Sequence, residues 1–286
     1  MTSLLVRKLL VFALTILSHS ANATLSCTAP VSTGFSMAYA ATGVVPNIKQ
    51  GTVSFNCTRT AAGDATSVLL TANDGAHAQG TQNRAQKVNR ILYEAYKDSN
   101  CSAVWTSLVV SNFWTLNLLN VLGAQPVSVS YWGCITVANQ VVSAGTYTDT
   151  VTMRVRQNTP QRQVLSPTST FPVSITTPAS LTITSPPGNL PFVYTAFGPS
   201  VNASSTFTAN GTLNLSYTMT LDDNSGVISG LKYDLKIDAQ TPPVKAVGSG
   251  TDQVHTIQGN MPAGQAGTCN TGSCSSSQVR TLTITY

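Results

Sequence analysis

The residues of this chain that could do chemistry are six cysteines, a few histidines and one pair of adjacent carboxylates. Cysteine and histidine bind zinc when they come in closely spaced pairs such as CxxC, whereas cysteines of an exported protein form disulfides. The chain has no CxxC pair, and only His77 and His255 lie beyond its signal-like N-terminus. Three disulfides are therefore favoured over a metal site. They would use Cys27, Cys57, Cys101, Cys134, Cys269 and Cys274.

No catalytic arrangement of nucleophile, base and orienting group can be assembled from these residues. A GxSxG nucleophile motif is absent from the sequence. His77 lies in the polar loop NDGAHAQG with no evident partner, and His255 in DQVHTIQG fits a strand. Asp222 and Asp223 in LDDNSG fit a hairpin turn better than a carboxylate pair or a Ca²⁺ site. We therefore expect no enzyme activity, no cofactor and no metal.

The first 23 residues have the three parts of a secretory signal peptide. A basic start, MTSLLVRK, precedes the apolar run LLVFALTIL, and SHSANA ends in a small-x-small pattern formed by Ala21 and Ala23. The apolar run is too short for a permanent transmembrane helix. We expect cleavage after Ala23, export of the mature chain and no membrane span.

Charge and composition argue against a nucleic-acid partner. Loss of Arg7 and Lys8 with the signal peptide lowers the formal net charge from +5 to +3, and no Lys/Arg cluster remains to neutralise phosphates. Charged residues make up only 9% of the chain, while Ser, Thr, Asn, Gln and Gly are abundant. This composition is more typical of a secreted β-protein than of a cytosolic enzyme.

Short alternating runs bounded by Gly, Pro, Asn and Ser predict an all-β chain, and three of these runs occur twice. The three pairs are GTVSFNC at 51–57 with GTLNLSY at 211–217, ILYEAYKD at 91–98 with LKYDLKID at 231–238, and TVTMRV at 150–155 with TLTITY at 281–286. Because the matches keep the same order, we expect two copies of one all-β domain with different loop lengths.

This alignment of the two copies also predicts the cysteine pairing. Cys57 aligns with Tyr217, and the position equivalent to Cys27 is Leu181. The second copy has therefore lost both positions together, which favours a Cys27–Cys57 disulfide. The remaining pairs would be Cys101–Cys134, closing a long loop, and Cys269–Cys274, pinning a tight turn.

The motifs of the first copy resemble the spore coat protein U domain family, found in secreted pilus subunits of the archaic chaperone–usher pathway. The resemblance lies in a leading cysteine, a G-x-V-x-x-x-C strand, an LxYxxYxD…W segment and AGTYTDTVTMRV. It extends over 25–156, and less closely over 170–286, where the first cysteine pair and the Gly-x-Tyr-x-Asp turn are missing. The motif residues are Cys27, Gly51, Val53, Cys57, Leu92, Tyr93, Tyr96, Asp98, Trp105, Gly145, Tyr147, Asp149 and Val151.

The resemblance implies an incomplete immunoglobulin-like sandwich that lacks one edge strand. In the family, a periplasmic chaperone supplies this strand first, and an N-terminal extension of the next subunit supplies it in the fibre. Such a groove is unstable until a strand fills it. In STFPVSITT, just before the second copy, Phe171, Val173 and Ile175 alternate as in a donor strand. We expect them to fill the groove of the first copy; the alternative is an ordered surface linker.

The two ends of the mature chain predict its place in a fibre. Only residues 24–26 precede Cys27, too few for a donor strand, so the subunit would receive a strand without donating one. That is the layout of a tip adhesin. At the C-terminus, an edge strand for the chaperone and then the next subunit would be formed by Leu282, Ile284 and Tyr286.

An apolar, tryptophan-rich segment of the first copy is the predicted adhesive site. SLVVSNFWTLNLLNVLG at 107–123 is nearly free of charge, and it breaks the alternation expected of a strand. An exposed apolar patch on a secreted protein usually marks an interaction surface, although such side chains can equally fill a core. The candidates for hydrophobic contact are Phe113, Trp114, Leu118, Leu119 and Val121.

The sequence thus predicts an all-β protein of two tandem immunoglobulin-like, incomplete pilin-type sandwiches. The expected parts are a signal peptide 1–23, an adhesin domain 24–157, a linker 158–180 with the donor-strand segment, and a pilin-like domain 181–286. The expected function is that of a pilus tip subunit in a cell-surface fimbrium, reached through the periplasm, which mediates adhesion to surfaces and biofilm formation. The expected partners are a periplasmic chaperone, an outer-membrane usher, the adjacent pilin subunit and a host or abiotic surface. The alternatives are a non-adhesive structural pilus subunit, a spore-coat-like protein and a carbohydrate-binding module.

Overall fold

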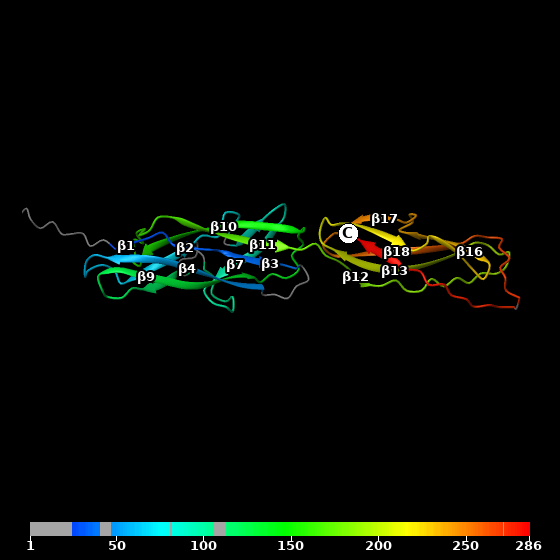
Figure 1. Cartoon of the computed structure of the whole chain (residues 1–286), viewed down its shortest axis with the longest axis horizontal. Coiled ribbons are helices and arrows are strands. Elements are labelled where there is room, and N and C mark those ends of the chain that lie inside the picture. The colour runs from blue at the N-terminus through cyan, green and yellow to red at the C-terminus, as the bar shows by residue number, and fades with distance from the viewer. Residues whose placement is uncertain (1–24, 41–46, 81, 106–111, 271) are drawn as a thin grey trace, which may run out of the picture.

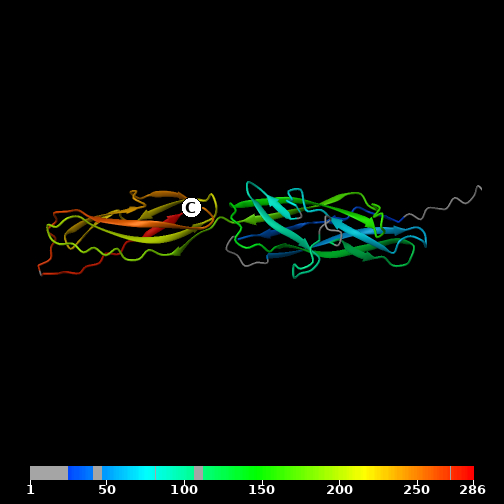
Figure 2. The same cartoon turned by 180° about the vertical axis from the view of Figure 1, so that it is seen from behind.

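A computed structural model describes residues 25–40, 47–80, 82–105, 112–270 and 272–286. In these ranges the chain forms β-strands only, β1 to β19, and no helix that could cross a membrane. The strands build two elongated sandwiches that lie end to end (Figures 1 and 2). The predicted all-β class with two tandem immunoglobulin-like sandwiches is confirmed. The predicted signal peptide 1–23 lies outside the described residues.

The first sandwich consists of two layers joined along one side into a single eleven-stranded sheet. One layer contains β1, β2, β4, β9 and β7, and the other contains β3, β11, β10, β5 and β8, while β6 pairs with both β7 and β10. The strands are β1 Ser26–Cys27, β2 Val31–Ser32, β3 Phe35–Ala38, β4 Asn47–Arg59, β5 Ser67–Ala72, β6 Asn83–Gln86, β7 Arg90–Tyr96, β8 Trp114–Asn117, β9 Gly123–Ile135, β10 Gly145–Gln157 and β11 Ser169–Thr177.

The second sandwich has two separate sheets. One has the order β12-β13-β18-β16-β15 and the other the order β17-β14-β19. Its strands are β12 Leu181–Ser185, β13 Val201–Gly211, β14 Ser216–Leu221, β15 Ser225–Ile228, β16 Leu231–Ile237, β17 Val244–Val247, β18 Asp252–Met261 and β19 Leu282–Thr285. Residues 178–180 are all that separates β11 of the first sandwich from β12 of the second.

Alternation along the long strands decides which side chains enter the core. In β4 every second residue from Gly51 to Arg59 is buried, and β10 shows the same pattern from Tyr147 to Val155. This period of two is what a strand with one face on a core requires. The two layers therefore enclose one large hydrophobic core. The second sandwich has two smaller clusters instead.

The predicted repeat is correct for two of its three segment pairs. β7 pairs with β6 and β9 as β16 pairs with β15 and β18, and β10 pairs with β5 as β19 pairs with β14. The pairing of 51–57 with 211–217 is wrong, because 51–57 lies within β4 whereas 211–217 runs from the end of β13 into β14. Gly-Thr followed by alternation is common to many strands, so this match did not fix the register.

The register instead identifies Gly211 as the counterpart of Cys57. Cys27 lies opposite Cys57 in the β1–β4 pair, and Leu181 lies opposite Gly211 in the β12–β13 pair. Leu181 is thus correctly matched to Cys27, but Tyr217 is not the equivalent of Cys57. A Cβ on Gly211 would lie 3.1 Å from Leu181 Cδ1, so the leucine side chain covers the glycine. The second sandwich therefore has the Leu181–Gly211 contact at the position where the first sandwich has the Cys27–Cys57 disulfide.

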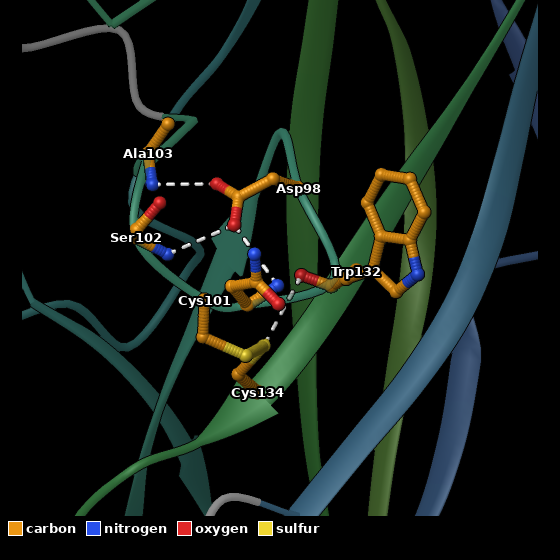
Figure 3. Close-up of a disulfide and its surroundings, with 7 residues drawn as sticks. Asp98, Cys101, Ser102, Ala103, Trp132 and Cys134 are labelled. Carbon is orange, nitrogen blue, oxygen red and sulfur yellow. Dashed lines mark hydrogen bonds between the residues drawn. A yellow bond between two sulfur atoms is a disulfide. The ribbon is translucent and has the colours of Figure 1, made fainter.

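All three predicted disulfides are present, as Cys27–Cys57, Cys101–Cys134 and Cys269–Cys274. Figure 3 shows the second pair, which ties the loop after β7 to the end of β9. The Asp98 carboxylate organises that loop by accepting hydrogen bonds from the backbone N of Ser102 (3.2 Å) and of Ala103 (2.7 Å). These bonds lower the pKa of Asp98, so the carboxylate stays charged and holds the loop at neutral pH.

Candidate functional site

β11 occupies a groove between β10 and β3 in the first sandwich. It pairs antiparallel with β10 along nine positions, from Gly145 opposite Thr177 to Met153 opposite Ser169. On its other side it runs parallel to β3, with Val173 opposite Phe35. Gly34, at a φ of +72°, permits the close approach, because a Cβ there would lie 1.8 Å from Pro172 O. The strand therefore completes this layer of the sandwich.

The three alternating side chains of β11 fill the centre of the first core. Phe171, Val173 and Ile175 are each at most 1% exposed. The Phe171 ring lies 6.2 Å from the ring of Trp105 and 5.2 Å from that of Tyr131, between centroids. Burial of side chains of this size stabilises a fold by about 1.5–3 kcal/mol each. The segment is thus a core strand and not a linker lying on the surface.

The start of β10 is fixed by two buried tyrosines, which keeps the partner strand of β11 in place. Tyr147 donates its hydroxyl hydrogen bond to Ser143 O at 2.8 Å, the tyrosine-corner arrangement of immunoglobulin-like folds. Tyr93 donates to Asp149 Oδ2 at 2.7 Å. Burial, and next the charge of Asp149, raises the pKa of Tyr93 well above its ordinary range, so the phenol remains a donor.

The second sandwich has no counterpart of β11 among its described residues. β19 pairs with β14 on one side and with no other described strand on the other. Leu282 and Ile284 of this strand are only partly buried against the core. In the other cluster of this sandwich, Phe192 and Tyr194 from the segment that follows β12 are also only partly buried. An edge strand and a row of incompletely covered apolar side chains are what an acceptor groove presents.

The predicted edge-strand residues differ in their surroundings. Leu282 and Ile284 point toward the core, whereas Tyr286 is 66% exposed and lies beyond the last paired residue, Thr285. The C-terminus lies at the end of the second sandwich that faces the first (Figures 1 and 2). β19 therefore runs toward the first sandwich, and a strand added antiparallel to it would run away from the first sandwich. In the same way, β11 runs antiparallel to β10.

An apolar loop, 118–122, connects β8 to β9 at the end of the first sandwich that points away from the second. β9 begins at Gly123 opposite Arg59, and β1, at that outer end in Figure 1, pairs with the same end of β4. Leu119 is 71% exposed, Val121 52% and Leu122 61%. Three large apolar side chains thus project from one short loop.

Two buried polar side chains hold this loop from inside. The guanidinium of Arg59, itself 1% exposed, donates to Asn120 Oδ1 at 2.9 Å and to Leu119 O at 3.3 Å. The Gln125 amide accepts from Leu119 N at 2.7 Å and donates to Val121 O at 2.9 Å. Because these bonds satisfy the loop backbone from the protein side, the apolar side chains are presented outward on an ordered support.

The predicted adhesion residues divide into exposed and buried ones. Leu119 and Val121 are exposed, but Leu118 is 7% exposed and belongs to the first core, so it cannot contact a surface. Trp114 is partly buried against the same core. Phe113 is partly buried, with the Arg162 guanidinium 5.0 Å from its ring centroid. Leu118 follows β8 and turns inward, a direction that alternation could not predict at a strand end.

Leu122 and the supporting pair Arg59 and Gln125 were missed by sequence reasoning. Leu122 lies within the apolar segment and could have been included on hydrophobicity alone. Arg59 and Gln125 gave no local signal, because their role depends on the pairing of β4 with β9.

The two histidines have fixed partners. His77 Nδ1 lies 3.1 Å from Asp149 Oδ1, a partner that was not evident from the sequence because the two residues are 72 positions apart in the chain. His255 lies on β18 as predicted, with Nδ1 2.7 Å from Asp238 Oδ2 and Nε2 2.8 Å from the hydroxyl of Tyr217. Both histidines thus take part in hydrogen-bond networks within the sandwiches.

Comparison with known proteins gives one family match and several remote structural similarities. Residues 12–154 match the Spore Coat Protein U domain. No curated protein matches the chain. One solved structure with a similar chain is the CsuC–CsuE chaperone–tip adhesion subunit pre-assembly complex from archaic chaperone-usher Csu pili of Acinetobacter baumannii. The identity is 14% and the TM-score 0.38, and the match covers 90% of this chain and 100% of the chain from that complex. CfaE, the adhesive subunit of CFA/I fimbria of enterotoxigenic Escherichia coli, is similar at 9% identity and a TM-score of 0.37, covering 88% and 96%.

Proposed function

Because the chain belongs to the Spore Coat Protein U domain family, we propose that it is a subunit of an archaic chaperone–usher pilus. In this proposal it passes through the periplasm with a chaperone, is assembled at an outer-membrane usher, and stands at the tip of a cell-surface fimbrium. There it mediates attachment to host or abiotic surfaces and biofilm formation.

The observation that carries the proposal is the difference between the two grooves. β11 fills the groove of the first sandwich from within the chain, while β19 of the second sandwich has a free edge among the described residues. A periplasmic chaperone and then the adjacent pilin subunit would supply a strand at that edge. The first described strand, β1, is tied to β4 by pairing and by the Cys27–Cys57 disulfide, so it belongs to its own sandwich.

The adhesive part of the proposal rests on the loop 118–122. Its three exposed apolar side chains lie at the free end of the first sandwich, opposite the end that joins the second. An apolar patch on an exported protein marks a contact surface. The internal support by Arg59 and Gln125 keeps the patch from collapsing onto the core. A predominantly hydrophobic contact with the target surface follows.

The test combines fibre labelling with loop substitution. Immunogold labelling should place this subunit at fibre ends; labelling along the shaft would contradict the tip position. Replacing Leu119, Val121 and Leu122 together by Ser should abolish attachment to a hydrophobic surface while fibres still assemble.

A matched control distinguishes the loop from general surface hydrophobicity. Val193, Val254 and Val279 of the second sandwich are at least 68% exposed, and their joint replacement by Ser should leave attachment unchanged. If the loop variant attaches as well as the wild type, the adhesive role is wrong, and a non-adhesive structural subunit becomes the better proposal.

A further inference from the structure

One glutamine side chain in the first sandwich pairs with a strand edge as a backbone segment would. Gln140, in the loop between β9 and β10, accepts a hydrogen bond at Oε1 from Leu92 N of β7 (2.6 Å) and donates one from Nε2 to Leu92 O (3.1 Å). Nε2 also donates to Val137 O, three residues earlier in the loop, at 3.2 Å. The backbone N of Gln140 donates to the hydroxyl of Tyr39, the residue after β3, at 2.8 Å. Gln140 thus ties its loop to both β7 and the end of β3.

The second sandwich repeats this arrangement bond for bond. Gln265, in the loop between β18 and β19, accepts from Lys232 N of β16 at 2.7 Å and donates to Lys232 O at 3.0 Å. It also donates to Pro262 O, again three residues earlier, at 3.0 Å. Its backbone N donates to the hydroxyl of Tyr194 at 2.8 Å. Lys232 and Leu92 are each the second residue of the repeated segments 231–238 and 91–98, so the two glutamines are equivalent.

The segment before each tyrosine also lies in the same place in its sandwich. The ring of Phe35 on β3 covers Gly133 of β9, and a Cβ on that glycine would clash with the ring. In the second sandwich, the ring of Phe192 covers Gly259 of β18 in the same way. The two glycines are equivalent, because each pairs with the fifth residue of its repeated segment, on β7 or on β16. Residues 190–194 are therefore the counterpart of β3.

This correspondence shows where a strand is missing from the second sandwich. β3 is the parallel neighbour of β11, and Tyr39 N donates to Thr176 O at 2.8 Å at the end of that pair. Among the described residues, no strand pairs with 190–194. Leu190 packs against both core clusters of the second sandwich, one of which β19 also contacts. Residues 190–194 and β19 thus correspond to β3 and β10, the two strands between which β11 lies.

We propose that Gln265 and Tyr194 hold residues 190–194 in position as the second wall of the acceptor groove before a strand enters it. Both are positioning residues for strand binding, and this inference rests on the proposed function of the second sandwich as a strand acceptor. No β-ladder holds this segment, and Pro191 has no backbone N–H to donate, so the bond from Gln265 to Tyr194 fixes its end. A wall that is already in place lowers the ordering cost of binding and raises the affinity for the strand.

The test measures binding of a fluorescein-labelled peptide with the sequence of residues 169–177 to the purified full chain. The wild type should bind this peptide and should not bind a version with Asp at its three apolar positions. Gln265→Ala should raise the Kd of the peptide by about tenfold or more, because several hydrogen bonds are lost. Tyr194→Phe removes only the hydroxyl and keeps the ring, so it should raise the Kd less, by about threefold or more.

Two further variants separate positioning from a general loss of folding. Gln258→Ala changes an exposed glutamine of β18 and should bind the peptide as the wild type does. Gln265→Glu keeps the acceptor for Lys232 N, but its ionised carboxylate cannot donate to Lys232 O or Pro262 O. It should therefore bind weakly at pH 7 and regain affinity relative to the wild type below about pH 4.3, where an ordinary glutamate becomes protonated and can donate.

The two ways in which this test can fail are distinguishable. If the wild type binds the peptide and both Gln265→Ala and Tyr194→Phe bind it equally well, the inference is wrong while the acceptor groove stands. If the wild type does not bind the peptide, the second sandwich is not a strand acceptor, and the proposed function fails together with the inference.

Discussion

The two sandwiches differ in what lies beside their last strand. β10 of the first pairs with β11 from Gly145 to Met153, whereas β19 of the second has a free edge among the described residues. β11 also comes directly before the second sandwich in the chain. β11 therefore completes the first sandwich while the second sandwich follows it in the chain. This is the relation proposed above between a pilus subunit and the neighbour that donates a strand to it.

The hydrophobic cores of the two sandwiches also differ in size and in how completely they are buried. Phe171 of β11 packs against the rings of Trp105 and Tyr131, which also contact each other, within one large cluster, while the second sandwich keeps two smaller clusters with partly exposed members. β11 is therefore not a peripheral strand of the first sandwich, since it lies between β10 and β3. It supplies the central side chain around which the first core is packed.

The largest effect is expected from removing the apolar side chains of β11. Joint replacement of Phe171, Val173 and Ile175 by Asp should unfold the first sandwich and leave the second folded. Their burial contributes about 1.5–3 kcal/mol each, buried charges add a further cost, and a domain has only about 5–15 kcal/mol of net stability. Limited proteolysis of the exported chain would show selective loss of the first sandwich.

The control for this variant uses the outward face of the same strand. Ser174 and Thr176 replaced by Asp keep the strand but place the charges away from the core, so the first sandwich should stay protease-resistant. Normal folding and secretion of the triple Asp variant would show that β11 does not complete the first sandwich.

A smaller but opposite effect is expected from filling the second groove. Appending a short turn and a copy of residues 169–177 after Tyr286 would let the added strand return antiparallel to β19. Three apolar side chains buried beside Leu282 and Ile284 should raise the free energy of unfolding of the second sandwich by several kcal/mol, at about 1.5–3 kcal/mol each. Urea unfolding measures the change. An appended strand carrying Asp at the three apolar positions should have no effect, and equal stabilisation by both would mean that no groove is being filled.

The smallest effect concerns the disulfide that the second sandwich lacks. Leu181→Cys with Gly211→Cys should form a bridge in the register of Cys27–Cys57 and raise the free energy of unfolding by about 1–3 kcal/mol. The lower part of this range is expected, because a Cβ at Gly211 lies 3.3 Å from Gly248 Cα. Thiol titration and urea unfolding with and without reductant measure it. If the oxidised and reduced forms are equally stable, the two strand pairs are not equivalent.

Features of the fold that depend on the alternation of side chains along one strand were predictable from the sequence. Features that depend on which residues of two strands lie opposite each other were not. Alternation in STFPVSITT was enough to place Phe171 in a strand, and the joint loss of two cysteine positions gave the Cys27–Cys57 pair. The partner position in the second copy was misplaced at Tyr217, since alternation fixes a face but not how far a strand extends. Leu118 was misassigned for a related reason, because a residue just beyond a strand can turn either way.

The internal supports of the loop 118–122 were beyond sequence reasoning. Arg59 and the loop are about 60 residues apart and meet only because β4 pairs with β9. This support is created by tertiary pairing, which no local pattern encodes.

β11 also gives the connection between the two sandwiches a mechanical character. A pull on the second sandwich reaches the first at Thr177 and acts along the strand axis, because β11 runs lengthwise toward the junction (Figure 1). The hydrogen bonds that join it to β10 lie across that axis, from Thr177 back to Ser169. They are loaded in shear and share the tension, rather than opening one at a time as in a peeled hairpin. The strand that completes the first core thus also connects the two sandwiches covalently. Pulling the sandwiches apart through this connection requires extracting β11 from the first core.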